Sequence, residues 1–189
     1  MKRIILAMIL LFVPVKVWAG GLLMIGSGEE LPALAACTTS NDSAIFDDTG
    51  GASSYEDPIT FGVPAARQFV TTVTKTITEY LINVQDVNNL DSLTLALYTD
   101  SSNSVGTIIA DTTVTIAAGS IPAGPGVVAF TLASPKTGLA AGTYWVHAST
   151  GSGSLFKTWA FDSSGIRVLA QGSYYDNYSH QMAVYGCSE

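Results

Sequence analysis

LTLALYTD, residues 93–100, is the stretch that decides the fold. Leu93, Leu95 and Leu97 alternate with smaller or more polar residues, the period of two that is typical of a β-strand with one buried face. Turn-forming residues follow, because Asn103 can bond its own backbone and Gly106 tolerates a positive φ. No catalytic signature accompanies the stretch. It predicts a strand of an antiparallel sheet.

Three more strand signals lie downstream of this stretch. Residues 107–118 are rich in β-branched side chains, which suit a pleated surface, and 127–132 and 143–147 resume the pattern after breaks rich in Gly, Pro and Ser. Four strand signals separated by turn signals predict a meander or Greek-key core. We therefore expect an all-β chain, folded as an antiparallel β-sandwich of jelly-roll type.

The rest of the chain has the same character. Further strands are predicted at 43–46, 65–84, 155–161, 166–170 and 180–185. Loops are predicted at 47–58 and at the aromatic segment 171–177. The alternation within 65–84 changes phase near Thr78 and Glu79, which predicts a β-bulge or bend there. No long segment keeps helical spacing of its apolar residues, so no helix is expected.

The amino terminus has the pattern of a secretory signal peptide. Lys2 and Arg3 precede the apolar residues 4–15, and cleavage is expected after Ala19. A transmembrane anchor is the alternative, but the apolar run is shorter than the roughly 20 residues that a spanning helix needs. The predicted organisation is a signal peptide at 1–19, an irregular leader at 20–36 and a single β-sandwich domain at 37–189. A secreted location, extracellular or periplasmic, follows, with no membrane span after removal of the signal.

Composition and charge narrow the classes of function. Charged residues make up 12% of the chain, against about 25% in typical globular proteins. Without the signal peptide, five basic residues remain against 15 acidic ones, a formal charge of −10. Such a surface repels phosphate backbones, so nucleic acid is not an expected partner.

Two cysteines, Cys37 and Cys187, stand near the two ends of the predicted domain. In an exported protein an even pair predicts a disulfide, which requires the first and last ordered segments to be neighbours. Two alternatives stay open. Both thiols are free, or Cys37 carries a lipid, because LAAC at 34–37 matches a bacterial lipobox pattern.

The order of these motifs resembles the choice-of-anchor β-sandwich domains of bacterial exported proteins, specifically an R-like type. The likeness covers about residues 65–187 and rests on LTLALYTD at 93–100, Gly106, TII at 107–109, FTL at 130–132, Leu139, AGTYWV at 141–146 and Trp159. The resemblance implies a jelly-roll domain similar to carbohydrate-binding modules, at a cell surface or outside the cell. The sorting tail of such proteins does not follow Cys187.

Catalysis and metal binding have little support in the sequence. Nucleophile-elbow, zinc-protease and P-loop motifs are absent, so the chain is not predicted to be an enzyme, with a hydrolase lacking a recognisable motif as the residual alternative. His147 is interpreted as a packing residue within a strand. Oxygen ligands suitable for calcium gather at Asp47, Asp48, Glu56 and Asp57, but their spacing matches no EF-hand loop. No metal site or other cofactor is therefore predicted.

The best binding candidate is the aromatic segment near the carboxyl end. Flat rings that stack on sugar faces, next to polar groups that bond hydroxyls, suit a carbohydrate ligand. The candidate ligand-binding residues are Tyr174, Tyr175, Asp176, Asn177, Tyr178 and His180. Trp145 and Trp159 are interpreted mainly as core residues.

Two functions of different classes remain. One is a secreted, non-catalytic surface or adhesion module that binds carbohydrate, or a cell-surface protein, through the aromatic segment. The other is a structural subunit of a cell-surface or virion-associated layer, which predicts an oligomer formed through an edge strand or an exposed apolar patch.

Overall fold

The computed structural model describes residues 17–18, 22–23, 36–50, 55–88, 90–117, 119–151, 153–162 and 166–189. The chain divides into two units, Met1–Ala35 and Ala36–Glu189. In the first, β1 (Val17–Trp18) pairs antiparallel with β2 (Leu22–Leu23). Apart from these four positions and Ala36, the predicted signal peptide and leader lie outside the described residues. No helix in the described part of the chain is long and apolar enough to cross a membrane.

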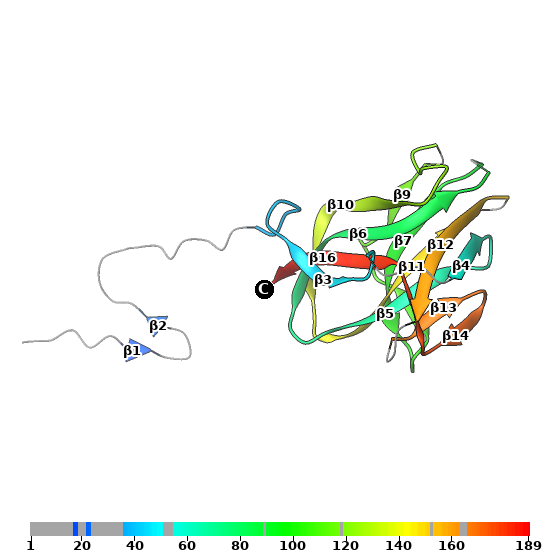
Figure 1. The fold of residues 1–189 in the computed structure, drawn as a ribbon. Helices are drawn as coiled ribbons and strands as arrows, with labels where there is room; N and C mark the ends of the chain where they lie inside the picture. The colour runs from blue at the N-terminus through cyan, green and yellow to red at the C-terminus, as the bar shows by residue number, and fades with distance from the viewer. Residues whose placement is uncertain are drawn as a thin grey trace, which may run out of the picture. The chain divides into compact units, whose positions relative to one another are not determined.

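The second unit is built from strands (Figure 1). In order they are β3 (Ser43–Asp47), β4 (Tyr55–Thr60), β5 (Ala65–Thr71), β6 (Lys75–Asp86), β7 (Leu93–Asp100), β8 (Val105–Ile108), β9 (Val114–Ile116), β10 (Gly126–Leu139), β11 (Gly142–Thr150), β12 (Leu155–Asp162), β13 (Val168–Ala170), β14 (Ser173–Tyr175), β15 (Tyr178–His180) and β16 (Met182–Ser188).

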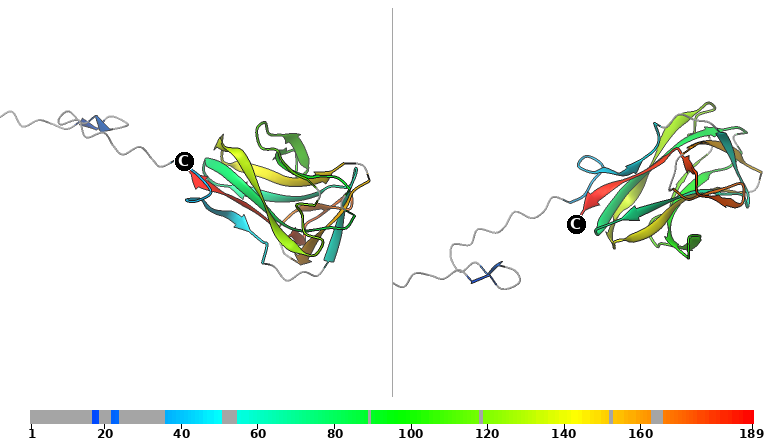
Figure 2. Two further views of the ribbon diagram at one scale, coloured as in Figure 1. Left: turned by 90° about the horizontal axis from the view of Figure 1, so that it is seen from above. Right: turned by 60° about the horizontal axis from the view of Figure 1, so that its bottom comes forward.

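These strands form two antiparallel sheets (Figures 1 and 2). The β6 sheet has the order β15-β12-β6-β16-β3, with β10 also paired to β6 and β4 to β12. The β11 sheet has the order β14-β13-β5-β11-β7-β8, with β9 also paired to β7. The long strands β5, β6, β7, β10, β11 and β12 lie alternately in one sheet and the other, so the chain crosses repeatedly between the sheets, as it does in jelly-roll folds. The predicted all-β antiparallel sandwich is confirmed.

The main core lies between the two sheets. Leu93, Leu95 and Leu97 of β7 are fully buried in it, as their alternation predicts, and Phe130 of β10 and Val146 of β11 join them. A second, smaller cluster contains Ala66, Trp145 and Leu169, from three neighbouring strands of the β11 sheet. Successive strand residues point to opposite faces, so Trp145 and Val146 belong to different clusters.

Several predicted boundaries need correction. The segment 65–84 is two strands in different sheets, because the chain turns at 72–74 between β5 and β6. The segment 107–118 is divided between β8 and β9 by a turn in which Asp111 has φ 62°, a conformation that Asp tolerates better than most residues. The predicted loop at 47–58 contains the start of β4, and β10 continues past 132 to Leu139.

The predicted bulge in β6 is confirmed. Glu79 pairs with Tyr185 and Ile77 with Gly186, so Thr78 has no residue opposite it on β16. The Thr78 hydroxyl bonds the Asp42 carboxylate instead. A bulge of this kind bends the strand and increases its local twist.

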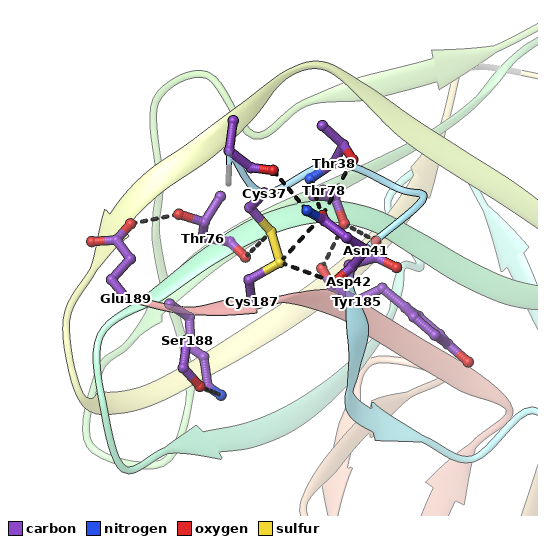
Figure 3. Close-up of a disulfide and its surroundings, with 12 residues drawn as sticks. Cys37, Thr38, Asn41, Asp42, Thr76, Thr78, Tyr185, Cys187, Ser188 and Glu189 are labelled. Carbon is purple, nitrogen blue, oxygen red and sulfur yellow. Dashed lines mark hydrogen bonds between the residues drawn. A yellow bond between two sulfur atoms is a disulfide. The ribbon is translucent and has the colours of Figure 1, made fainter. Parts of the chain in front are cut away.

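Cys37 and Cys187 form the predicted disulfide, with Cα atoms 5.8 Å apart (Figure 3). The bond is possible because β16 lies between β6 and β3, which brings the end of the chain beside the segment that leads into β3. The Asn41 side chain closes that segment by donating from Nδ2 to the Ala36 carbonyl at 2.9 Å. Since the Cys37 sulfur is bonded to Cys187, it is not available for the lipid of the alternative interpretation.

Candidate functional site

A pocket of about 360 Å³ opens where an edge of the β6 sheet, formed by β4 and β15, meets the β14 edge of the β11 sheet. The β6 sheet contributes β4, β12 and β15 to its wall, and the β11 sheet contributes β13, β14 and the turn between them. The lining residues are Tyr55, Glu56, Asp57, Ala160, Ala170, Gln171, Tyr175 and Tyr178. Its volume falls within the range of about 300–1,000 Å³ that is usual for small-ligand sites.

A tight hairpin places the aromatic segment at this pocket. Gln171 and Gly172, between β13 and β14, have φ values of 49° and 78°, as a type I′ hairpin turn requires. The predicted loop at 171–177 is therefore a turn followed by a strand. Because β14 is a strand, Tyr174 and Tyr175 point to opposite faces of the sheet, and only Tyr175 reaches the pocket.

Three tyrosines form the aromatic wall of the pocket. The Tyr178 ring meets the Tyr55 ring edge to face at a centroid distance of 5.0 Å and the Tyr175 ring at 5.3 Å. Tyr55 and Tyr175 remain 45% and 38% exposed. Edge-to-face packing is a favourable geometry for ring pairs, so the three rings support one another while keeping open surface.

The polar side of the pocket is centred on Asp57. Its Oδ1 accepts a hydrogen bond from Gln171 Nε2 at 3.0 Å, and its Oδ2 lies 3.6 Å from His180 Nδ1. The Asp57 side chain keeps 9% exposure. Glu56, the neighbouring carboxylate, pairs with Lys157 Nζ at 2.8 Å on the exposed surface.

His180 lies behind Asp57 and is fully buried. Its Nε2 faces the Leu169 carbonyl at 3.1 Å, and since a carbonyl only accepts, this nitrogen carries the proton. Its Nδ1 is buried and has no hydrogen-bond partner. Burial lowers the pKa of the His180 imidazole, outweighing the opposite influence of Asp57. The ring therefore packs behind Asp57 and does not face the pocket as a general base.

Of the six predicted ligand residues, the structure places Tyr175 and Tyr178 in the pocket wall. Tyr174 packs edge to face on Trp145 at 5.6 Å, and its hydroxyl accepts a hydrogen bond from the Val105 backbone N–H at 3.0 Å. Tyr174 is thus a packing residue of the smaller cluster.

The other three predicted residues lie outside the pocket lining. Asp176 pairs with Arg167 Nη1 at 2.5 Å on the surface. The exposed Asn177 forms a backbone bridge with Ile166. His180 is enclosed, as described above.

His147, Trp145 and Trp159 are packing residues, as the sequence predicts. Trp145 and Trp159 are buried, and Trp145 Nε1 donates to Asp100 Oδ1 at 2.8 Å. The half-buried His147 packs against Tyr98, with ring centroids 4.7 Å apart and ring planes tilted by 42°. Burial lowers the pKa of His147 to about 4.

A second polar group lies between the sheets. Arg67, which is buried on β5, pairs with Asp48, and its Nε donates to Ser179 Oγ at 2.9 Å. Its guanidinium also lies 3.7 Å from the centre of the Phe46 ring. Because Arg67 belongs to the β11 sheet and Ser179 to the β6 sheet, the group ties the two sheets together.

The acidic residues considered as calcium ligands have separate partners. Asp47 accepts from the Tyr185 hydroxyl at 2.7 Å, Asp48 pairs with Arg67, and Glu56 pairs with Lys157. Within the described ranges, no group of three or more His, Cys, Asp and Glu side chains is placed to hold a metal ion.

Sequence reasoning missed Tyr55 and Gln171 and did not connect Asp57 with the aromatic segment. These residues reach the site through the pairing of β4 with β12, in which Tyr55 lies opposite Ala160, and through the β13–β14 turn. The clustering of Tyr55, Glu56 and Asp57 was visible in the sequence, but its long-range pairing was not. The arrangement offers aromatic faces, one amide and one nearly enclosed carboxylate, which together suit recognition of a small polar ligand.

No family model matches this chain, and no curated protein matches it either.

Proposed function

We propose that the chain is an exported, non-catalytic module that binds a glycan in the tyrosine-walled pocket. The observation that carries the proposal is the placement of Tyr55, Tyr175 and Tyr178 around the polar side chains of Asp57 and Gln171. Apolar faces of sugar rings pack on aromatic side chains, while a carboxylate and an amide bond hydroxyl groups. The disulfide is consistent with an oxidising compartment outside the cytosol.

The geometry of the pocket favours binding over catalysis. His180 meets a carboxylate, as a hydrolase would require, but the ring is enclosed and its protonated nitrogen faces the Leu169 carbonyl. Glu56 and Asp57 are consecutive on a strand and therefore point to opposite faces, so they do not form the opposed carboxylate pair of a glycosidase.

The test is a glycan array with the purified, disulfide-bonded chain, compared with the variant Tyr175→Ala/Tyr178→Ala. The double variant should lose glycan binding while its circular dichroism spectrum stays that of the parent. Phe61→Ala is a matched control, because Phe61 is 69% exposed and follows the far end of β4 from Tyr55. Equal binding by the parent and the double variant would overturn the proposed site.

One observation favours the second candidate function, a subunit of a surface layer. Along the described part of the chain, β10 pairs only with β6, so the other edge of β10 carries no paired strand. Val127, a residue of β10, is 52% exposed. Open edges of this kind are templates for pairing between chains. Concentration-dependent self-association that disappears in Val127→Lys, measured by light scattering, would support this function, and a monomer at all concentrations would exclude assembly of the chain alone.

A further inference from the structure

In the described part of the chain no Lys or Arg side chain pairs with the Asp57 carboxylate, and its one ion-pair contact is with His180, whose pKa burial lowers. Three basic residues of the second unit are already paired with other carboxylates: Arg67 with Asp48, Lys157 with Glu56 and Arg167 with Asp176. Among the described residues, the Asp57 carboxylate accepts one hydrogen bond, from the side-chain amide of Gln171. A nearly buried carboxylate with so few donors is costly unless a further donor or a positive charge approaches it.

The neighbouring imidazole does not supply that donor. Because His180 carries its proton on Nε2, the lone pair on Nδ1 faces Asp57 Oδ2 at 3.6 Å, and Nδ1 has no hydrogen-bond partner among the described residues. Two acceptors directed at each other repel, and burial strengthens that repulsion. The Asp57 carboxylate therefore gains no donor from the His180 side, and a further donor can reach it only from the pocket.

The aromatic wall has a matching preference. Ring faces carry negative charge density, and cations near tyrosine faces are stabilised, more so when they are partly withdrawn from water. The planes of Tyr55 and Tyr175 lie at 76° and 69° to that of Tyr178, and all three rings line the pocket. Such an arrangement, together with a carboxylate, suits a compact positive group.

We propose that the glycan recognised by this pocket carries a protonated amino group, as an amino sugar without an acetyl group does, and that this ammonium bonds Asp57. The inference rests on the proposed function, since it names the class of sugar that the same pocket takes. The sugar ring lies against Tyr175 and Tyr178, and the ammonium supplies the donors that the Asp57 carboxylate lacks. A neutral sugar would supply hydroxyl donors but no charge.

The experiment compares two oligosaccharides that differ only in that group. Glucosamine oligomers and their N-acetylated counterparts are titrated calorimetrically into the purified chain at about pH 6, where the sugar amine is protonated. We expect the amino form to bind about tenfold more tightly, equivalent to about 1.4 kcal/mol, with a preference that weakens as salt is added.

Two variants with the same change of charge locate the effect. Asp57→Asn is nearly isosteric and still accepts a hydrogen bond from Gln171, so it should abolish the preference for the amino form. Asp111→Asn is the control, because Asp111 is exposed, does not line the pocket, and has a positive φ that Asn also tolerates. Should Asp57→Asn prove unfolded by circular dichroism, Tyr175→Ala tests the same pocket from its exposed wall.

The outcomes separate the two proposals. Equal affinity for both oligomers would overturn the amino-sugar inference and leave glycan binding in place. Failure of any glycan to bind would overturn the proposed function itself. A preference for the amino form that survives Asp57→Asn in the folded variant would place the charge recognition elsewhere and also overturn the inference.

Discussion

Removing the disulfide should cost this chain a large part of its stability. The variant Cys37→Ser/Cys187→Ser opens a loop whose ends are 150 residues apart in sequence. For a loop of this length the chain-entropy relation gives about 5 kcal/mol at room temperature. Domains are typically stable by about 5–15 kcal/mol, so the variant should lie close to the limit of folding.

The native contacts that the substitution removes are few. The Cys187 sulfur lies 3.7 Å from the Asn41 carbonyl and the Cys37 sulfur 3.9 Å from that of Thr76, which are weak contacts (Figure 3). The loss should therefore arise in the unfolded state, which becomes free to expand. We expect the urea m-value to rise together with the fall in stability, because a more expanded unfolded chain exposes more surface.

Equilibrium unfolding in urea under non-reducing conditions measures both quantities. The parent chain unfolded in the presence of a reductant is the control and should match the double variant. A loss below about 1 kcal/mol with an unchanged m-value would refute the reasoning, since the entropy of loop closure would then not limit the unfolded chain.

Three further outcomes are expected. Arg67→Met should cost about 2–3 kcal/mol in urea unfolding, because Asp48 loses its buried partner but keeps some contact with water, and a variant as stable as the parent would contradict this. Stability should fall as pH is lowered from about 6.5 to 4, since burial lowers the pKa of His147 to about 4 and the unfolded chain takes up the proton first. His147→Phe should remove up to about 3 kcal/mol of that fall, which thermal unfolding across this pH range would detect or exclude. Gly186→Ala should destabilise the sheet by about 2 kcal/mol or more, because a Cβ there meets the Thr76 carbonyl, and an unchanged melting temperature would argue against this packing.

Much of the fold could be predicted because it is encoded locally. The leucines of β7 alternate and lie in the core, and the change of phase near Thr78 is a real bulge. Prediction from the local sequence pattern failed where one or two residues with positive φ turn the chain. Asp111 divides a β-branched run through its positive φ, and Gln171 with Gly172 turns a supposed aromatic loop into a hairpin.

The candidate site was only half predictable for a related reason. Tyr175 and Tyr178 belong to a short segment whose composition is conspicuous, so the sequence points to them. Which tyrosine faces the pocket depends on strand phase, and this excluded Tyr174. Tyr55 and Asp57 reach the pocket through a pairing of β4 with β12 across about 100 residues, which no local pattern reports.

The position of β16 also governs when the chain can fold. This strand lies between β6 and β3, so it is synthesised after all the other strands of the two sheets and still fills an interior position. Until it arrives, β6 and β3 keep unpaired edges and the core lacks Met182 and Val184. A chain whose translation has not passed Ser188 therefore lacks the strand that joins β6 to β3, and its sandwich cannot close before that point.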